Sequence, residues 1–198
     1  MPRENHSCSA VASRSELGFL AARYSIKLDM DGFLIKSRRL EEDEEDCENV
    51  WYAYVETNPP SEWFNGSYYV DTLSTPAMQK FVDITYETYK KAVGSEFGKT
   101  VPAIFTDEPQ FALKNQLQLA HGKRDIFLPW TLDLPETYQS AYNTDISDSL
   151  PEVVWDIRGP SKTRYNYHDH GKTLSILCTI QYSTLTYRSL FTLCKILH

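Results

Sequence analysis

The stretch Val101-Pro-Ala-Ile-Phe-Thr-Asp-Glu-Pro109 is the part of the sequence from which the fold is predicted. Its apolar run, residues 101–105, has the length of a buried strand. The run ends in Asp107, Glu108 and a proline that cannot continue a strand ladder. An α/β barrel presents its catalytic carboxylates in this way, at the carboxyl ends of its strands. A strand followed by a solvated acidic turn is the alternative interpretation.

A short strand and a helix precede this stretch and complete a βαβ pattern. The strand is predicted at Tyr68-Tyr-Val70, and it ends at Asp71. The helix is predicted from a cap at Ser74 or Thr75, through an apolar face of three- and four-residue spacing, to a stop at Gly94. Strand, helix and strand in this order favour a parallel sheet.

Further elements are predicted on both sides of this unit. Residues 24–28 and 33–37 alternate in polarity around Asp29-Met-Asp-Gly32, which predicts a β-hairpin. The two acids also suggest a calcium loop, but the later ligands of such a loop are missing. Residues 50–55 are rich in strand-forming side chains, and helices are expected at 135–142 and 146–155.

Length and charge restrict the possible functions. The 198 residues suffice for one domain, whereas a complete (β/α)₈ barrel needs about 250. The net charge of −7 argues against nucleic acid or an anionic membrane as a partner. No run of about 18 apolar residues is present, so no membrane span is expected. Residues 1–15 lack the pattern of a signal peptide, which makes a cytoplasmic location the default expectation and leaves the compartment open.

The cysteine and histidine pattern indicates neither a metal nor a cofactor. The cysteines have no C-x-x-C spacing, and their number does not make a disulfide framework, which favours a reducing compartment. His168 and His170 could bind a metal from a strand, but two ligands are too few. Histidines hydrogen-bonded at the start of a helix are the preferred interpretation.

The chain is expected to have three parts, with boundaries at residues 23 and 170. Residues 1–23 show no clear pattern, and residues 24–170 contain the elements above. Residues 171–198 form an atypical tail without acidic residues, which we interpret as foreign to the domain. A genuine C-terminal strand pair is the alternative for this tail.

Several motifs occur in an order that resembles a group of microbial barrel proteins. The specific part of the resemblance extends from Trp63 to Gln110, within a total of about residues 24–170. These proteins are labelled as glycoside hydrolases, either as family 2 sugar-binding proteins or as relatives of the α-L-rhamnosidase barrels. The motifs are Trp51-Tyr-Ala-Tyr54, Trp63-Phe-Asn-Gly66, Tyr69-Val-Asp71, Phe97-Gly-Lys-Thr100, Ile104-Phe-Thr-Asp-Glu-Pro109, Leu128-Pro-Trp-Thr131 and Tyr165-Asn-Tyr-His-Asp169.

The resemblance implies a carbohydrate-binding cleft with a catalytic carboxylate. Glu108 would be the general acid and base of glycoside cleavage, a reaction that normally uses two carboxyl groups. Asp107 could instead be that acid, or could orient its neighbour. An aromatic face and an amide suit a sugar subsite, so the substrate-binding candidates are Trp63, Phe64, Asn65, Asp71 and Trp130. For Asp71, helix capping is an equally good interpretation.

One departure from the family bears on activity. The second catalytic carboxylate would lie on a later strand, and the tail replaces that part. The fold predicted is therefore α/β, a partial (β/α)₈ TIM-type barrel with an N-terminal β-hairpin insertion. We expect a hydrolase fragment that is inactive alone, with exposed sheet edges through which copies could associate. The alternatives are a non-catalytic carbohydrate-binding remnant and a truncated product without its own activity.

Overall fold

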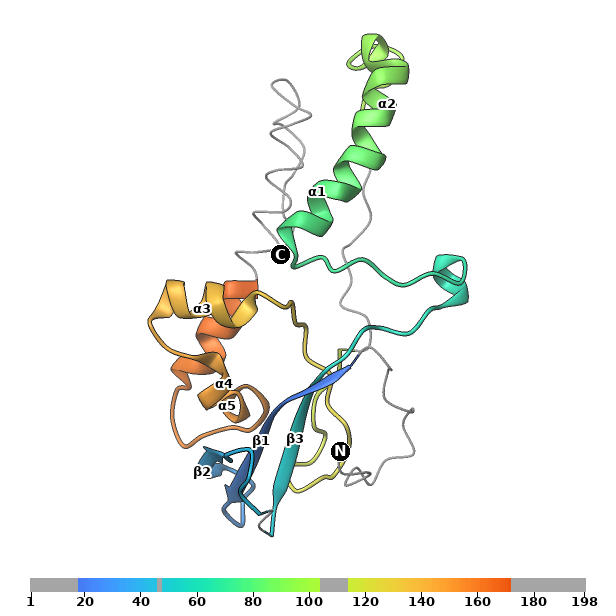
Figure 1. Ribbon diagram of the computed structural model, residues 1–198. Helices are drawn as coiled ribbons and strands as arrows, with labels where there is room; N and C mark the ends of the chain where they lie inside the picture. The colour runs from blue at the N-terminus through green and yellow to red at the C-terminus, as the bar shows by residue number, and fades with distance from the viewer. Residues whose placement is uncertain (1–17, 46–47, 104–113, 172–198) are drawn as a thin grey trace. The chain divides into compact units, whose positions relative to one another are not determined.

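The computed structural model describes residues 18–45, 48–103 and 114–171, which belong to two compact units (Figure 1). The first unit takes its residues from 1–69 and 112–170. The second takes its residues from 70–111 and 171–198. Among the described residues, no helix has the length and apolar character needed to cross a membrane.

A three-stranded antiparallel sheet is the centre of the first unit. Its strands are β1 (Phe19–Leu28), β2 (Leu34–Arg39) and β3 (Val50–Val55), in the order β2-β1-β3 (Figure 1). The predicted hairpin is confirmed, with Ile26 opposite Ser37. Gly32 has a φ of +89° in its turn, a conformation that favours glycine, and a side chain there would meet the Cβ of Ala120 at 2.4 Å.

The prediction of an α/β fold built as a partial (β/α)₈ barrel is wrong. The described sheet is antiparallel throughout, and its hairpin is the middle of the sheet rather than an insertion. Residues 68–70 form no strand, and Val101 forms only a single bridge with Phe97. Three apolar residues become a strand only when a neighbouring strand pairs with them, and the sequence pattern did not contain that information. Residues 104–105 of the predicted central strand lie outside the described residues.

The first hydrophobic core joins the sheet to a much later part of the chain. Trp155 is 4% exposed, and its ring meets Trp51 edge-on at 4.8 Å between centroids. Its Nε1 donates a hydrogen bond to the carbonyl of Ala120 at 2.9 Å. The buried members of this core are Ala22, Tyr24, Ile26, Leu34 and Trp155. The sheet, whose last strand ends at residue 55, is therefore covered by the indole of Trp155, which lies about 100 residues later in the sequence.

Short helices form a second core in the same unit. They are α3 (Leu134–Tyr142), α4 (Ile146–Ser149) and α5 (Pro151–Val154), followed by a helix at residues 162–171. The helices predicted at 135–142 and 146–155 are confirmed, the second of them divided into α4 and α5, with Pro151 as the first residue of α5. The buried residues of this core are Leu134, Tyr138, Ile146, Val153 and Tyr167.

In the second unit, the predicted helix is present but divided in two. Its parts are α1 (Thr75–Ile84) and α2 (Tyr86–Val93). Ser74 caps α1 by accepting a hydrogen bond from Ala77 N, as predicted, and Val82 is its buried residue. Thr85 separates the helices, with ψ of −72° and a side-chain hydrogen bond to the carbonyl of Phe81. The short 3₁₀ helix η2 (Gly94–Glu96) follows α2.

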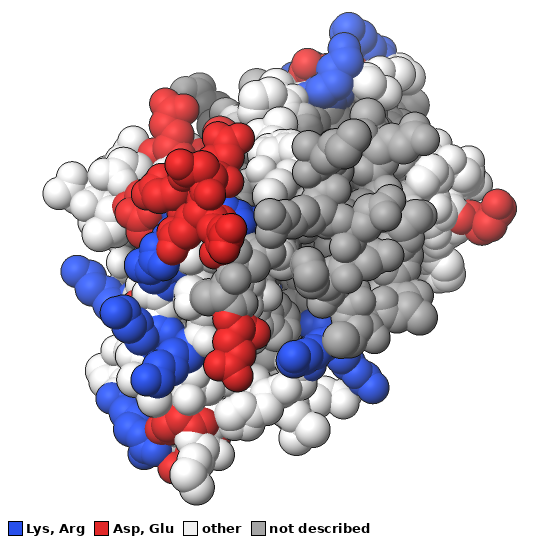
Figure 2. All heavy atoms as spheres, turned by 60° about the horizontal axis from the view of Figure 1, so that its bottom comes forward, with Lys and Arg blue, Asp and Glu red and all other residues white. Residues whose placement is uncertain are grey.

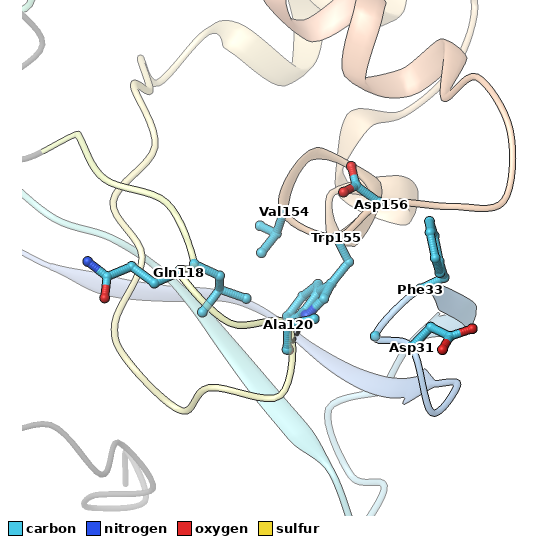
Figure 3. Close-up of a pocket in the computed structure, with 9 residues that line it drawn as sticks. Asp31, Phe33, Gln118, Ala120, Val154, Trp155 and Asp156 are labelled. Atoms are coloured by element: carbon cyan, nitrogen blue, oxygen red, sulfur yellow. Dashed lines mark hydrogen bonds between the residues drawn. The ribbon is translucent and has the colours of Figure 1, made fainter.

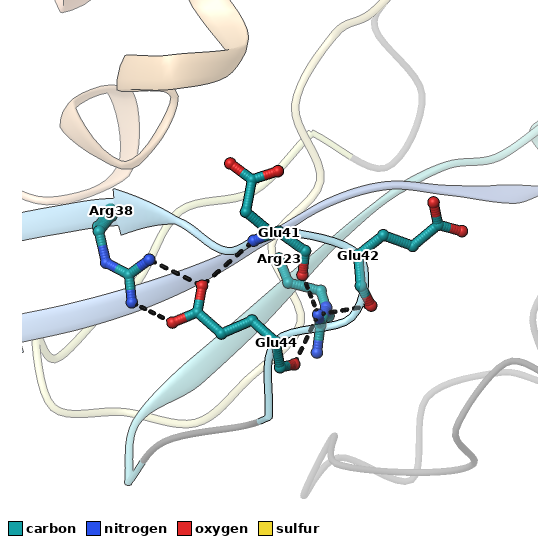
Figure 4. A network of polar contacts seen from close by, with 5 residues as sticks. All are labelled: Arg23, Arg38, Glu41, Glu42 and Glu44. Atoms are coloured by element: carbon teal, nitrogen blue, oxygen red, sulfur yellow. Dashed lines mark hydrogen bonds and ion pairs between the residues drawn. The ribbon is translucent and has the colours of Figure 1, made fainter.

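The acidic run after β2 is folded back onto arginines of the sheet. Figure 2 shows acidic side chains gathered on one face of the molecule, with basic side chains beside them. In detail, Arg38 forms a two-pronged ion pair with Glu44, and Arg23 donates to the carbonyls of Glu41, Glu42 and Glu44 (Figure 4). The hydrogen bond from Arg38 lowers the pKa of Glu44 to about 2. These carbonyls and this carboxylate already have a cation, so the loop is a structural feature rather than a site for a metal.

Candidate functional site

Three of the predicted sugar-binding residues, Trp63, Phe64 and Asn65, lie in one closed loop. We define this loop as residues 61–67 and call it the aromatic loop. It contains the 3₁₀ helix η1 (Glu62–Phe64). Ser61 closes the loop, because its N–H donates to the carbonyl of Ser67 at 3.2 Å and its own carbonyl accepts from Phe64 and Gly66 at 2.9 Å. The Ser61 hydroxyl also accepts from Trp63 N at 3.2 Å. The backbone of this loop is therefore held by its own hydrogen bonds.

Two consecutive residues with positive φ return the chain after η1. Asn65 has φ 54° and ψ 41°, and Gly66 has φ 72°. Asparagine and glycine are the residues that adopt this left-handed conformation most readily. The Asn-Gly pair thus has a backbone role in the aromatic loop, in addition to the sugar-reading role predicted for the Asn65 amide.

The two neighbouring aromatic side chains of the loop differ in their surroundings. Phe64 is half-buried, and its ring packs against Tyr69 at 4.8 Å between centroids. Trp63 is 86% exposed, and it makes no ring or cation contact with any described residue. Phe64 therefore anchors the loop, while the Trp63 indole is free to bind a ligand.

The other predicted substrate-binding residues do not join this loop. Trp130 is partly buried and packs against the second core. Asp71 belongs to the second unit, where its Oδ1 accepts a hydrogen bond from Leu73 N at 3.0 Å just before α1. This contact shapes the turn before α1, whose cap is Ser74 and not Asp71. Asp107 and Glu108, the predicted catalytic residues, lie outside the described residues.

A small cavity of about 200 Å³ lies elsewhere in the first unit (Figure 3). Its mouth carries Asp31 and Asp156, and its other lining residues are Gly32, Phe33, Leu117, Gln118, Ala120, Val154 and Trp155. Arg158 pairs with Asp31 at 2.7 Å, and Arg164 forms an ion pair with Asp156. Both carboxylates at the mouth are therefore already neutralised, and the volume is below that of ordinary ligand sites, about 300–1,000 Å³.

The residues at this cavity were not singled out by the sequence, apart from the turn acids. Asp29 belongs to the same turn as Asp31, and its desolvation acts to raise its pKa. Hydrogen bonds from Phe33 N–H and Arg158 outweigh that effect and hold the pKa of Asp29 below its ordinary value. The position of Arg158 was not predictable, because its carboxylate partners are more than 120 residues away in the sequence.

The histidine cluster at the end of the first unit has a packing role. His170 is buried on the helix 162–171, and its Nε2 lies 2.9 Å from Thr137 Oγ1 on α3. Its ring also meets Tyr138 and Tyr142 edge-on. Residues 164–170 are helical as expected, but the helix begins at residue 162, so His168 and His170 lie near its last described residues and not at its start. No group of three metal-binding side chains occurs within the ranges that the structure describes.

Comparison with known proteins adds no relative to this description. No family model matches the chain, and neither a curated protein nor a solved structure does so.

Proposed function

We propose that this protein binds carbohydrate through the aromatic loop and does not cleave glycosidic bonds on its own. The observation that carries the proposal is the 86% exposure of Trp63 on a loop whose backbone is fixed by hydrogen bonds. Covering a flat apolar ring that is held in water in this way lowers the free energy of the complex. A pyranose ring has a matching face of C–H groups, and its hydroxyls remain in contact with water or with nearby polar groups.

The loop has the additional groups that such a ligand would use. Asn65, Ser67 and Tyr68 are exposed beside Trp63 and supply amide and hydroxyl partners. The ordering cost of binding is small, because the loop is closed before the ligand arrives. The glycoside hydrolase motifs of the sequence support the same class of ligand. Hydrolysis is less well supported, because the barrel fold that implied it is a wrong prediction.

The proposed lack of turnover is supported by the sequence of the acidic stretch. A retaining hydrolase needs two carboxyl groups that face one sugar across about 5 Å, and an inverting one needs a wider separation. Asp107 and Glu108 are adjacent in the sequence, and the resemblance implies a partner carboxylate much later in the chain, where the tail stands instead. Glu108 would therefore contribute one half of a catalytic pair.

The test is a titration of the full chain with neutral hexasaccharides of glucose, xylose and mannose, followed by calorimetry and tryptophan fluorescence. Trp63→Ala should lower the affinity for the hexasaccharide that binds at least tenfold, because it removes the stacking surface. Trp63→Phe keeps an aromatic ring and should lose less than about threefold. Trp51→Phe changes a partly buried partner of Trp155 and is the control for an indirect effect on folding.

Three outcomes would contradict the proposal. They are no binding of any hexasaccharide, binding that Trp63→Ala leaves unchanged, and release of reducing sugar by the purified chain. Sedimentation velocity on the same samples tests the predicted self-association. A dimer that Trp63→Ala converts to monomer, without any sugar binding, would make the aromatic loop a protein interface instead.

A further inference from the structure

The side chain that precedes the exposed indole is a carboxylate that pairs with none of the described residues. Glu62 opens η1, is exposed, and its carboxylate has no hydrogen bond or ion pair with a described residue. It is the neighbour of Trp63 in a 3₁₀ helix, where successive side chains diverge by about 120°. A ring stacked on the indole would therefore lie within about 6–10 Å of this carboxylate, in water.

The sequence around the aromatic loop offers no positive charge to offset Glu62. From Leu40 to Gln79 the chain contains no Lys, Arg or His. Recognition of an anionic sugar normally depends on such a residue, above all on arginine, which forms paired hydrogen bonds with a carboxylate. The acidic run of residues 41–45 differs from Glu62, because arginines of the sheet already neutralise part of it.

We propose that Glu62 makes the aromatic loop selective for uncharged glycans and excludes those built from uronic acids. This inference rests on the proposed function, and it concerns the class of sugar that the same site accepts. Glu62 is a specificity-determining residue that acts through its charge. The effect is repulsive, so it lowers the affinity for the wrong ligand instead of raising that for the right one.

The experiment uses two ligands with one backbone, hexagalacturonate and the same hexasaccharide after reduction of its carboxyl groups to alcohols. The measured quantity is the ratio of their affinities for the full chain at low ionic strength. One added repulsion at about 6–10 Å in water corresponds to a factor of about two to three. Glu62→Gln should shift the ratio toward the uronate by this factor, and Glu62→Lys by about four- to tenfold.

Two controls separate the local charge from other causes. Asp43→Asn removes one negative charge from the acidic loop and should leave the ratio unchanged. In about 1 M salt the Debye length falls to about 3 Å, so the effect of Glu62→Gln should disappear. Equal shifts from Asp43→Asn and Glu62→Gln would overturn the inference.

The result also distinguishes this inference from the proposed function. If the wild-type chain and Glu62→Gln bind the reduced hexasaccharide and the uronate equally well, carbohydrate binding stands and the selectivity is refuted. If no ligand of this pair or of the neutral panel binds, the proposed function itself fails.

Discussion

Arg158 donates two hydrogen bonds to one carboxylate oxygen of Asp29, from Nε at 2.9 Å and from Nη2 at 2.6 Å, although the residues are 129 positions apart. The guanidinium also lies 4.7 Å from the centre of the Phe33 ring. The turn of the hairpin is thus attached to the loop that follows α5. This connection leads to the first prediction.

Asp29→Asn should lower the urea midpoint at pH 7 and have less effect in acid. Asparagine keeps an oxygen for the backbone N–H groups of Asp31 and Phe33 but loses the charge that Arg158 pairs with. Because the folded-state pKa of Asp29 lies below its ordinary value of 3.8, its contribution is present above that pH and is lost as the pH falls through the folded pKa. Asp43→Asn, at an exposed acid, is the control. An equal effect of Asp29→Asn at pH 7 and at pH 2.5 would contradict the role given to Arg158.

Leu134→Ala should lower the free energy of unfolding by about 2–5 kcal/mol, because it leaves a cavity in the second core. Leu134 is 1% exposed, whereas Leu132, two residues earlier, is 75% exposed. Leu132→Ala is therefore a matched control with the same chemical change, and it should cost less than about 0.5 kcal/mol. Chemical denaturation followed by circular dichroism measures both. Similar losses for the two variants would mean that α3 does not pack as described.

The protein should become less stable as the pH falls below about 6.5, through His170. Desolvation by burial lowers the pKa of His170, against the opposing influence of Asp133 and Asp169. The folded state therefore takes up this proton less readily than the unfolded state, and stability is lost as the pH falls toward the folded pKa. His170→Gln can still hydrogen-bond Thr137 but does not titrate. The stability of the wild type relative to this variant should decrease between pH 7.5 and 5, and an increase would refute the prediction.

Asn65 offers a test of the geometry of the aromatic loop. Asn65→Gly removes the amide and still permits a φ of 54°, whereas Asn65→Val disfavours that conformation by about 1–2 kcal/mol. If the role of Asn65 is to shape the backbone, glycine should retain sugar binding and valine should weaken it. If its amide reads sugar hydroxyls, both variants should weaken binding. Calorimetry with the hexasaccharide that the wild type binds separates the two roles.

The elements predicted correctly depend on local chemistry. Asp29-Met-Asp-Gly32 specifies its own turn, and Ser74 caps α1 through a residue three positions later. Neither of these requires knowledge of a distant partner. The same holds for the aromatic loop, where Ser61, Asn65 and Gly66 close the chain within seven residues.

The errors concern pairing across long sequence distances. Residues 68–70 were predicted to form a strand, but a strand requires a neighbour, and no local pattern names that neighbour. The parallel sheet was inferred from the order of the elements between residues 68 and 105, whereas the strands that the structure describes, β1, β2 and β3, pair antiparallel. Trp130 is predicted as part of a sugar subsite for the same reason, since the second core against which it packs forms only after the helices fold.

The closure of the first core by Trp155 has a consequence for synthesis on the ribosome. β3 ends at Val55, so about 100 further residues must be translated before the indole that covers the sheet exists. At about 5–20 residues per second this interval lasts roughly 5–20 seconds. During that time Tyr24, Ile26 and Leu34 lack their main cover, and a chaperone that recognises apolar strands would find its target in this nascent chain.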